Sequence, residues 1–386
     1  MMQRAHSGLG ASSMSRWMNC PGSYQLARRV TPPRPTIYAA TGTVAHDLIE
    51  ASLERPDHGD FASAVLGTAR DADGHTVVID EKLLHGVAVM DAYVRQAAHD
   101  YERVWVERRV SLDDYFPKRF PPPEPMYGWL DVGLLSIDRH FLEVVDYKNG
   151  GGVYVDAADN PQLLYYAAAA LRELSPEARA EITTVRLTIV QPNADKEYPV
   201  RSWDTSAFDV EMWVDEVLIP AVRALQAANA PFVPGDWCRF CPAARACPKL
   251  QEAALLAAQK SFEPVDISGK QLAGDLEIAE RAEIWIDAIR TRAEEELHAG
   301  HPVPGWALVD KRARRVWTDP DQVREVLGRL VNDLSQYEHR ELFTPAHLQE
   351  VLRDRPDLWR EVAHLAERLS SGKKLGRARI ALTPTP

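Results

Sequence analysis

The stretch from Asp131 to Lys148 constrains the fold of this chain more than any other. Apolar runs lie on both sides of Asp138-Arg139, a pattern that predicts two antiparallel strands joined by a tight turn. If that turn has two residues, Asp131 and Asp146 lie directly opposite each other. Cross-strand Cβ atoms are about 4.5–5.5 Å apart, and like charges at that separation repel each other. The sequence therefore predicts two crowded carboxylates at one end of a hairpin.

Lys148 adds a positive charge at the same end of the hairpin. It lies two residues beyond Asp146, so the two side chains share a strand face, which continues with Leu142 and Val144. Burying such charges is costly unless something neutralises them. Two convergent carboxylates can hold Mg²⁺ or Mn²⁺, and a lysine beside them can stabilise charge on a phosphate. The alternative is a surface ion pair between Lys148 and one aspartate on an ordinary hairpin.

The cysteines indicate a second site. The chain has only four, Cys20, Cys238, Cys241 and Cys247, and the last three form a C-x2-C-x5-C run. In a cytosolic protein, three clustered thiols and one distant thiol favour a metal or iron–sulfur site over disulfides. Ligation by four cysteines suits zinc or a four-iron cluster, and the spacing alone does not decide between them. The alternative is four unconnected buried thiols.

Composition sets the broad class of the protein. A chain of 386 residues, with 45% hydrophobic and 26% charged residues, is typical of soluble proteins with two or three structural units. No apolar run approaches the roughly 20 residues of a membrane span, and no signal-like segment opens the chain. We therefore expect a cytoplasmic protein that has no membrane partner. The net charge of −11 argues against general adhesion to nucleic acid.

Two further side chains of interest lie on predicted elements. Residues from 41 or 43 to 53 have a helical pattern and include His46. A lone histidine on a helix is more often structural than a ligand, and His46 taken by itself is interpreted as structural. Residues 103–112 are rich in β-forming side chains and predict a strand that contains Glu107.

A helix is predicted shortly after the hairpin. Asn160 is expected to cap it, and Pro161 occupies its first position, where the missing N–H costs nothing. Gln162 and Tyr166 then stand one turn apart on the same face. The elements predicted next are strands near 183–191 and 197–203 and a helix over about 206–229, which leads to the cysteine run.

These residues follow the order of motifs in a known nuclease family. The motifs are His46, Glu107, Gly128-x-x-Asp131, Asp146-x-Lys148 and Gln162-x-x-x-Tyr166. In this order the chain resembles the RecB-like branch of the PD-(D/E)XK nuclease superfamily over residues 9–250. The cysteine pattern resembles the iron–sulfur branch that includes CRISPR-adaptation exonucleases, helicase–nucleases and their phage relatives. Residues 262–386 resemble the tail of an uncharacterised phage and prophage family of this type.

The resemblance implies an α/β fold. The expected architecture is a restriction-endonuclease-like core, with a central mixed sheet flanked by helices, plus a helical C-terminal extension. The nuclease domain would span residues 1–261 and carry the cysteines on its N- and C-terminal arms. Residues 262–386 would be mostly helical, with a long helix over 270–297 and a small hairpin between 306–309 and 314–317. One departure from the superfamily pattern is that Leu130, and not proline, precedes Asp131.

The resemblance also assigns roles to residues. The expected metal ligands are His46, Asp131, Asp146 and the backbone carbonyl of Tyr147, with Mg²⁺ or Mn²⁺ as the ion. Glu107 would act through metal-bound water or a second metal site, and Lys148 would stabilise developing charge or position the nucleophile. Gln162 and Tyr166 would line the DNA path. A 4Fe–4S cluster, with zinc as the alternative, would be held by Cys20, Cys238, Cys241 and Cys247.

The function implied is metal-dependent hydrolysis of DNA, by an exonuclease that acts on ends or single strands in phage recombination, replication or repair. The expected setting is the cytoplasm of a bacterial or phage-infected cell, with DNA and a recombinase, a single-strand-binding protein or a helicase as partners. The alternative is a non-catalytic DNA-binding accessory subunit that keeps the fold and the cluster. Asp131, Asp146 and Lys148 favour the enzyme, because closely spaced carboxylates repel phosphate and give a binding module no advantage.

Overall fold

The computed structural model describes most of the chain. The described residues are 7–55, 61–194, 197–259, 268–310, 314–331, 338–339, 341–353, 355–369 and 373–377. Contacts divide the chain into two units, Met1–Ile286 and Asp287–Pro386. The division falls later in the chain than the boundary predicted at residue 261, and the two units are described separately.

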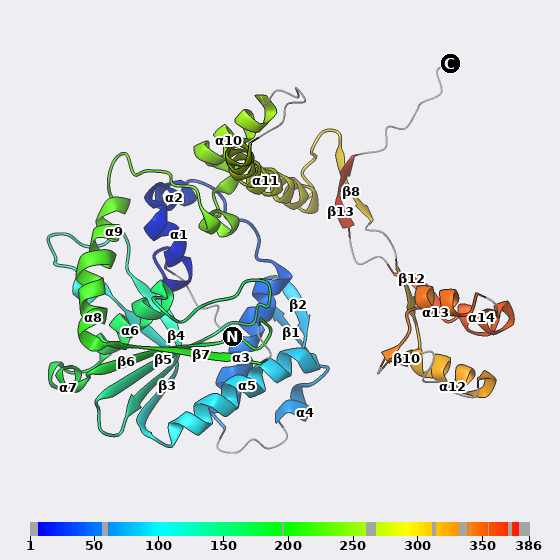
Figure 1. Cartoon of the computed structure of the whole chain (residues 1–386), viewed down its shortest axis with the longest axis horizontal. Coiled ribbons are helices and arrows are strands. Elements are labelled where there is room, and N and C mark those ends of the chain that lie inside the picture. Colours follow the sequence, from blue (N-terminus) through cyan, green and yellow to red (C-terminus); the bar gives the residue numbers. More distant parts are fainter. Residues whose placement is uncertain are drawn as a thin grey trace. The chain divides into compact units, whose positions relative to one another are not determined.

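The first unit is built on a five-stranded sheet with the order β3-β4-β5-β6-β7. The strands are β3 (Tyr101–Ser111), β4 (Tyr127–Ser136), β5 (Phe141–Tyr147), β6 (Thr184–Val190) and β7 (Val200–Ser206). Strands β5 and β6 are parallel, and every other neighbouring pair is antiparallel. The sheet is therefore mixed (Figure 1).

Strands β4 and β5 form the hairpin that the sequence predicted, in the predicted register. Val132 pairs with Val145, so the preceding residue, Asp131, lies opposite Asp146. The turn is longer than two residues, and Arg139 takes a positive φ of 60° within it. The register is nevertheless retained, because a longer turn with the same centre leaves the pairing of the strands unchanged.

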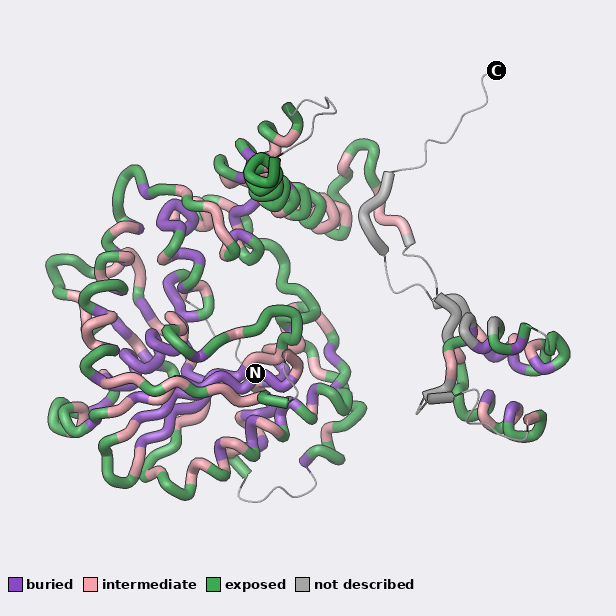
Figure 2. The backbone as a smooth tube through the Cα atoms, viewed as in Figure 1, coloured by how far each residue is buried: buried purple, intermediate pink, exposed green. Residues whose placement is uncertain are grey.

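Helices cover both faces of this sheet (Figure 1). On one face, α3 (Ile37–Leu53) and α5 (Glu81–Ala98) enclose a core that includes Val132 and Val145. On the other face, α6 (Pro161–Glu173) is central to a larger core. Figure 2 shows buried residues concentrated in the sheet and the helices next to it. The class is α/β, with a central mixed sheet flanked by helices, as predicted.

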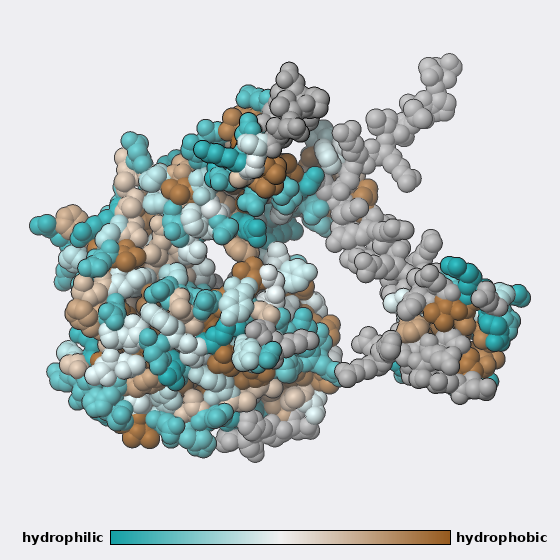
Figure 3. Space-filling view, in the orientation of Figure 1, coloured by the Kyte–Doolittle hydropathy of each residue, from teal (hydrophilic) through white to brown (hydrophobic). Residues whose placement is uncertain are grey.

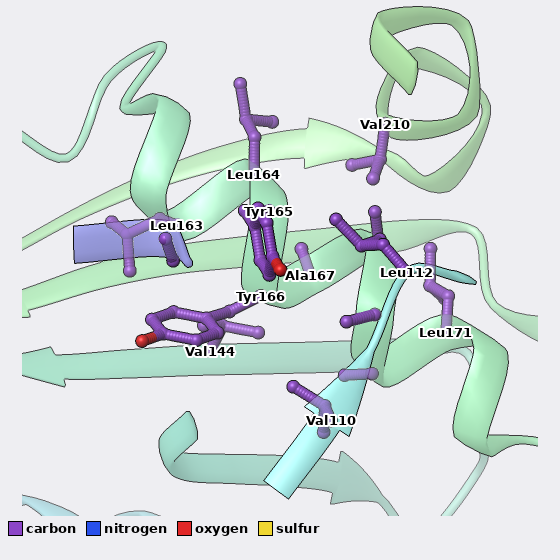
Figure 4. Packing of buried hydrophobic residues seen from close by; sticks show 14 of the residues in the cluster. Val110, Leu112, Val144, Leu163, Leu164, Tyr165, Tyr166, Ala167, Leu171 and Val210 are labelled. Carbon is purple, nitrogen blue, oxygen red and sulfur yellow. The ribbon is translucent and has the colours of Figure 1, made fainter. Parts of the chain in front are cut away.

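Helix α6 begins where the sequence predicted. The side chain of Asn160 accepts hydrogen bonds from the backbone N–H groups of Gln162 and Leu163, and Pro161 occupies the first turn. The helix then runs through a series of alanines, 167–170, all of them buried. Small side chains let the helix approach the sheet closely. Figure 4 shows the rings of Tyr165 and Tyr166 among the aliphatic side chains of this core.

The helix that follows β7 contains a wider turn. Helix α8 (Ala207–Trp213) continues through a π-helical segment, η3 (Val214–Leu218), into α9 (Ile219–Leu225). Pro220 lacks an N–H and so cannot bond to the carbonyl four residues earlier, which explains the irregular turn. The other elements of this unit are η1 (Ala11–Ser13), α1 (Met14–Asn19), α2 (Pro21–Ala27), α4 (Phe61–Val65), β1 (Ala69–Ala72), β2 (His75–Val78), η2 (Asp113–Tyr115), α7 (Pro176–Glu181), η4 (Asp236–Phe240), η5 (Ala244–Ala246) and α10 (Pro248–Gln259).

The long predicted helix is α11 (Gly269–His298), and the division between the units falls within it. Figure 3 shows hydrophobic side chains among polar ones over α10 and α11. Exposed apolar residues of these helices include Leu255, Leu256, Leu272 and Leu276. No helix in the parts of the chain that the structure describes is both long enough and apolar enough to span a membrane.

The second unit has its own small core and more strand than predicted. Its core is formed by Val323, Leu327, Leu348, Leu352, Leu358, Val362 and Leu365. Its elements are β8 (Trp306–Asp310), β9 (Arg314–Trp317), α12 (Pro320–Leu330), β10 (Glu338–His339), β11 (Glu341–Leu342), α13 (Pro345–Val351), α14 (Pro356–Ala363), β12 (Ala366–Leu369) and β13 (Lys373–Arg377). The predicted hairpin between β8 and β9 is wrong, because β8 pairs with β13 and β9 pairs with β12. Local turn signals give no information about such long-range partners.

Candidate metal centre

The two carboxylates of the hairpin meet in the interior. Asp131 is 7% exposed and Asp146 is 2% exposed. The backbone N–H of Tyr147 donates a hydrogen bond to Oδ2 of Asp131 at 2.7 Å, which fixes this carboxylate against the end of β5. One hydrogen bond leaves most of the acceptor capacity of Asp131 unused. The hairpin therefore buries two carboxylates at one end.

His46 joins this pair from α3. Its Nδ1 atom lies 3.2 Å from Oε1 of Glu107 and 3.4 Å from Oδ1 of Asp131. These three residues are the only group of histidine, cysteine and acidic side chains in the described part of the chain with at least three possible ligand atoms within 4.8 Å of one another. The ring of Tyr147 packs edge-on against His46, with centroids 5.8 Å apart. His46 is thus part of the site, and not only a structural residue.

Glu107 reaches the site through a distortion of β3. Its φ is +46°, which is unusual for a residue other than glycine. The ladder with β4 pairs Val106 with Val132 and Arg108 with Leu130, but it omits Glu107. The side chain is only 3% exposed despite its position in an edge strand. Such strain is typical of functional sites, where the surrounding structure maintains it.

Lys148, Asp146 and Gln162 form a closed triangle beside these ligands. Gln162 donates from Nε2 to Oδ1 of Asp146 at 2.9 Å, and its Oε1 accepts from Nζ of Lys148 at 2.9 Å. Nζ of Lys148 also lies 2.9 Å from Oδ2 of Asp146. That contact is an ion pair, so the ammonium group of Lys148 already neutralises much of the charge of Asp146. A divalent cation at this carboxylate would share it with Lys148 and Gln162.

The protonation of the centre reflects its crowded charges. Burial raises the pKa of Asp131 to about 7; Asp146 and Glu107 act in the same direction, and His46 opposes them. Burial alone would lower the pKa of His46, but Asp131, Glu107 and Asp146 outweigh it and raise the pKa to about 9. Without a metal, protons therefore supply positive charge among these carboxylates near neutral pH.

The two residues predicted along the DNA path have different surroundings. Gln162 lies between the side chains of Asp146 and Lys148, as described above. Tyr166, one turn later on α6, is 6% exposed and packs against Gly128 of β4. A Cβ at Gly128 would lie 2.8 Å from Cε1 of Tyr166, so this position requires glycine. Gly128 therefore sets how closely α6 approaches the strand that carries Asp131.

Sequence reasoning missed the residue that shapes the loop after Lys148. Gln191 is 1% exposed and donates from Nε2 to the carbonyls of Gly150 and Val153, at 2.8 and 2.7 Å. Its Oε1 accepts from the N–H of Val155 at 3.1 Å. The only sequence signal was a glutamine at the end of a predicted strand. Gln191 holds the flexible glycines in one conformation next to the site.

The four cysteines line a single pocket. Cys20 lies between α1 and α2, and the other three lie in the segment that leads to α10. The N–H of Val233 donates to Sγ of Cys20 at 3.3 Å, and the N–H of Gly235 donates to Sγ of Cys238 at 3.5 Å. These hydrogen bonds suit thiolate sulfur. The fold thus brings the distant thiol and the close triad to one place.

The spacing of the sulfur atoms bears on the group that they can hold. Four thiolates on one zinc ion would lie about 3.8 Å apart, from a Zn–S bond of about 2.3 Å and tetrahedral angles. Within the described residues, no three of these sulfur atoms lie within 4.8 Å of one another. The side chain of Arg16, 9% exposed, lies beside the pocket and donates to Oγ of Ser23 at 3.1 Å. The sulfur atoms are therefore farther apart here than the four ligands of a single zinc ion would be.

The fold and the site together define an α/β protein with a buried centre of carboxylates and one histidine. A family model described as "Protein of unknown function (DUF2800)" matches residues 6–375. The match covers nearly the whole chain, and the protein belongs to this family.

Proposed function

We propose that this protein is a metal-dependent deoxyribonuclease of the RecB-like PD-(D/E)XK type. The observation that carries the proposal is the convergence of four elements on one buried centre: His46 from α3, Glu107 from β3, Asp131 from β4 and Asp146 from β5. Lys148 and Gln162 complete the site beside Asp146. The fold brings together residues that lie up to a hundred positions apart in the sequence.

The residues present fit a hard divalent cation. Carboxylate oxygens are the ligands that Mg²⁺ prefers, and a histidine nitrogen beside them is well accepted by Mn²⁺. His46, Glu107 and Asp131 offer three possible ligand atoms within 4.8 Å of one another, and Asp146 interacts with Asp131 beside them. A bound cation would polarise the phosphate and lower the pKa of a bound water molecule.

The chain's own residues would do the remaining work. Lys148 lies at the edge of the centre with a side chain that is 26% exposed, so its ammonium group can reach a phosphate as well as Asp146. It would stabilise the charge that develops on the phosphate. Gln162 holds Asp146 and Lys148 in a fixed relation before substrate arrives, which reduces the reorganisation needed in the reaction. Glu107 would orient water on the side of His46.

The proposed fold type is a restriction-endonuclease-like core. The arrangement that supports it is a mixed sheet in which β5 and β6 are parallel and α6 makes the connection between them. The site lies at the ends of β5 and β6 where the chain leaves the sheet, since the N–H of Lys148 bonds to the carbonyl of Val190 at 2.9 Å. Ligands in α/β proteins commonly bind at the carboxyl ends of parallel strands.

The four cysteines are proposed to hold a 4Fe–4S cluster with a structural role. The shared pocket and the N–H donors to sulfur support ligation of one group by these cysteines, with zinc as the alternative to the cluster. Cys20 and Cys238 are separated by more than two hundred residues, so ligation would close a long chain loop. The free energy of binding the cluster would then contribute to folding.

The test is the degradation of end-labelled single- and double-stranded DNA with Mg²⁺ or Mn²⁺, beside the Asp146→Ala variant. The proposal predicts cleavage that needs the metal and that the variant lacks. Cleavage that survives in the variant would refute the site assignment. DNA binding without any cleavage by the wild type would instead favour a non-catalytic accessory subunit.

A further inference from the structure

One row of side chains on α3 leads from the surface to the candidate metal centre. Tyr38, Gly42 and His46 follow one another at four-residue intervals, so they form an inclined row along the helix. The rise of 1.5 Å per residue places Tyr38 about 12 Å from His46 along the helix axis. This length corresponds to about three nucleotides at the 3.4 Å spacing of stacked bases.

The middle of this row has no side chain. Gly42 lies inside α3, where glycine is less favourable than alanine because it loses more backbone freedom on folding. A Cβ at Gly42 would meet nothing within 4 Å, so packing does not require glycine here. Gly274 of α11 also has open space, which means that an open glycine alone does not define a site. Gly42 differs because it lies between an exposed ring and a candidate ligand.

Tyr38 presents its ring from a fixed base. The side chain is 84% exposed, although tyrosine carries a large apolar surface. The first turn of α3 is capped by Thr36, whose Oγ1 accepts from the N–H of Ala39 at 3.3 Å. The preceding residue is also held, because Nε2 of His75 lies 2.8 Å from the carbonyl of Pro35. An exposed aromatic ring on an anchored turn is a stacking surface for a base.

Another segment covers the adjacent side of α3, so the row of Tyr38, Gly42 and His46 faces away from that segment. Oγ1 of Thr43 donates to Oδ2 of Asp73 at 2.8 Å, so the turn between β1 and β2 covers the side next to Gly42. The chain up to His46 contains five arginines and no acidic residue. Three of these arginines, Arg28, Arg29 and Arg34, lie shortly before the helix. These arginines precede the helix in the sequence, and the carboxylate of Asp73 lies on its covered side.

We propose that Tyr38, Gly42 and His46 form a track for an unpaired nucleic acid strand. A base stacks on Tyr38, the backbone crosses the helix at Gly42, and a phosphate reaches the centre at His46. The substrate class is accordingly single-stranded DNA or a single-stranded end, because a base inside a duplex has both faces covered by its neighbours and cannot stack on Tyr38. This inference rests on the proposed nuclease function.

The test combines binding and cleavage with two variants of the track. Tyr38→Ala should weaken binding of fluorescein-labelled dT15 about ten-fold, measured by fluorescence anisotropy with Ca²⁺ in place of Mn²⁺, because one stacking contact is lost. Tyr38→Phe should bind more like the wild type than Tyr38→Ala does. Gly42→Leu fills the gap in the row, so cleavage of dT15 with Mn²⁺ should fall at least ten-fold while the melting temperature is maintained or rises.

The same substitutions elsewhere provide matched controls. Gly274→Leu changes another open helical glycine, and Phe208→Ala removes another exposed ring, 70% exposed in the first turn of α8. Neither should alter binding or cleavage of dT15. Wild-type cleavage that Tyr38→Ala and Gly42→Leu leave unchanged would overturn the track and leave the nuclease proposal standing. A wild type that cleaves no DNA with Mn²⁺ would overturn the proposed function, and the track with it.

A series of oligonucleotides provides an independent readout of the track. Affinity for dT strands should rise with length until the strand reaches Tyr38, about three nucleotides from the centre. Tyr38→Ala should remove that rise and leave the affinity for the shortest strands close to that of the wild type. A uniform loss at every length would instead indicate a general folding defect and would contradict the stacking role.

Discussion

The two oxygens of Asp146 have different surroundings, and this difference explains much of the centre. Oδ1 accepts a hydrogen bond from Gln162, and Oδ2 forms an ion pair with Lys148. Gln162 therefore fixes the orientation of a carboxylate that a bound cation would share with Lys148. Residues that orient a ligand in this way commonly affect metal affinity or activity by 10- to 100-fold when they are replaced.

The variant Gln162→Leu tests this role. It removes both hydrogen bonds of the amide while it keeps a side chain of similar size at the start of α6. We expect DNA cleavage to fall about 10- to 100-fold, with Mn²⁺ affinity measured in parallel by calorimetry. Gln226→Leu is the control, because Gln226 only donates to the carbonyl of Pro121. Equal activity of the two variants would show that Gln162 does not position the site.

The pKa values of the centre predict how the stability of the metal-free protein changes with pH. Asp131 titrates at about 7 instead of 3.8, and His46 at about 9 instead of 6.5, so the folded state binds both protons more tightly than the unfolded state. Stability therefore falls as pH rises, from about pH 4 to 7 for Asp131 and from about pH 6.5 to 9 for His46. Removing one repelling charge should relieve this loss.

Thermal unfolding of Asp131→Asn checks the sign. At pH 8, without metal, the variant should melt at a higher temperature than the wild type, and its melting temperature should vary less with pH. Added Mn²⁺ should stabilise the wild type more at pH 8 than at pH 6, because protons compete for the same ligands. It should stabilise the variant little. A variant that melts lower than the wild type at pH 8 would contradict the predicted repulsion.

At the scale of elements, local signals in the sequence were sufficient for the hairpin and for α6. The apolar runs around Asp138-Arg139 fixed the register of β4 and β5, because a slip by one residue would expose the whole buried face. Asn160 and Pro161 defined the first turn of α6, because capping depends only on neighbouring residues. The position of Asp131 opposite Asp146 across the hairpin was predicted from these local sequence patterns.

Contacts between distant segments could not be predicted from local sequence signals. The positive φ of Glu107 and its proximity to His46 depend on how α3 packs over β3, and neither residue carries a local signal for it. The start of α3 at Ile37 was missed because Thr36, its cap, lies in a proline-rich stretch. The partners of β8 and β9 come from the end of the chain. Helix and strand formation was thus more predictable than pairing and packing.

The contact between α6 and β4 provides a test at this scale. Gly128→Ala places a Cβ 2.8 Å from Tyr166, so the helix or the strand must shift, and overpacking of this kind costs about 1–3 kcal/mol. Gly274→Ala, at an open helical position, should instead be neutral or slightly stabilising. Denaturant unfolding of both variants measures the difference. Equal stabilities would mean that the close approach of α6 is not needed.

At the scale of the molecule, the cysteine pocket connects segments from the two ends of the first unit. Cys20 follows α1, and Cys238, Cys241 and Cys247 precede α10. Hydrogen bonds already join these segments, because the N–H of Gly22 donates to the carbonyl of Pro231 at 2.9 Å. A cluster held by all four thiols would strengthen this connection without taking part in the chemistry at Asp146.

The variant Cys241→Ala tests the connection. It should lose the visible iron–sulfur absorption of anaerobically purified protein and melt at a lower temperature, while the residues of the metal centre remain in place. Iron analysis of the wild type should give iron and not zinc. A variant that keeps both the colour and the melting temperature of the wild type would show that the cysteines do not hold a structural cluster.

The most direct test of the candidate metal centre is an anomalous difference map from crystals of the protein soaked in Mn²⁺. A cation at this centre should give a peak bounded by His46, Asp131 and Asp146, at distances suited to metal ligands, and no such peak in Asp146→Asn crystals. Manganese bound elsewhere, or none at these carboxylates in wild-type crystals, would contradict the claim that a divalent cation belongs between them.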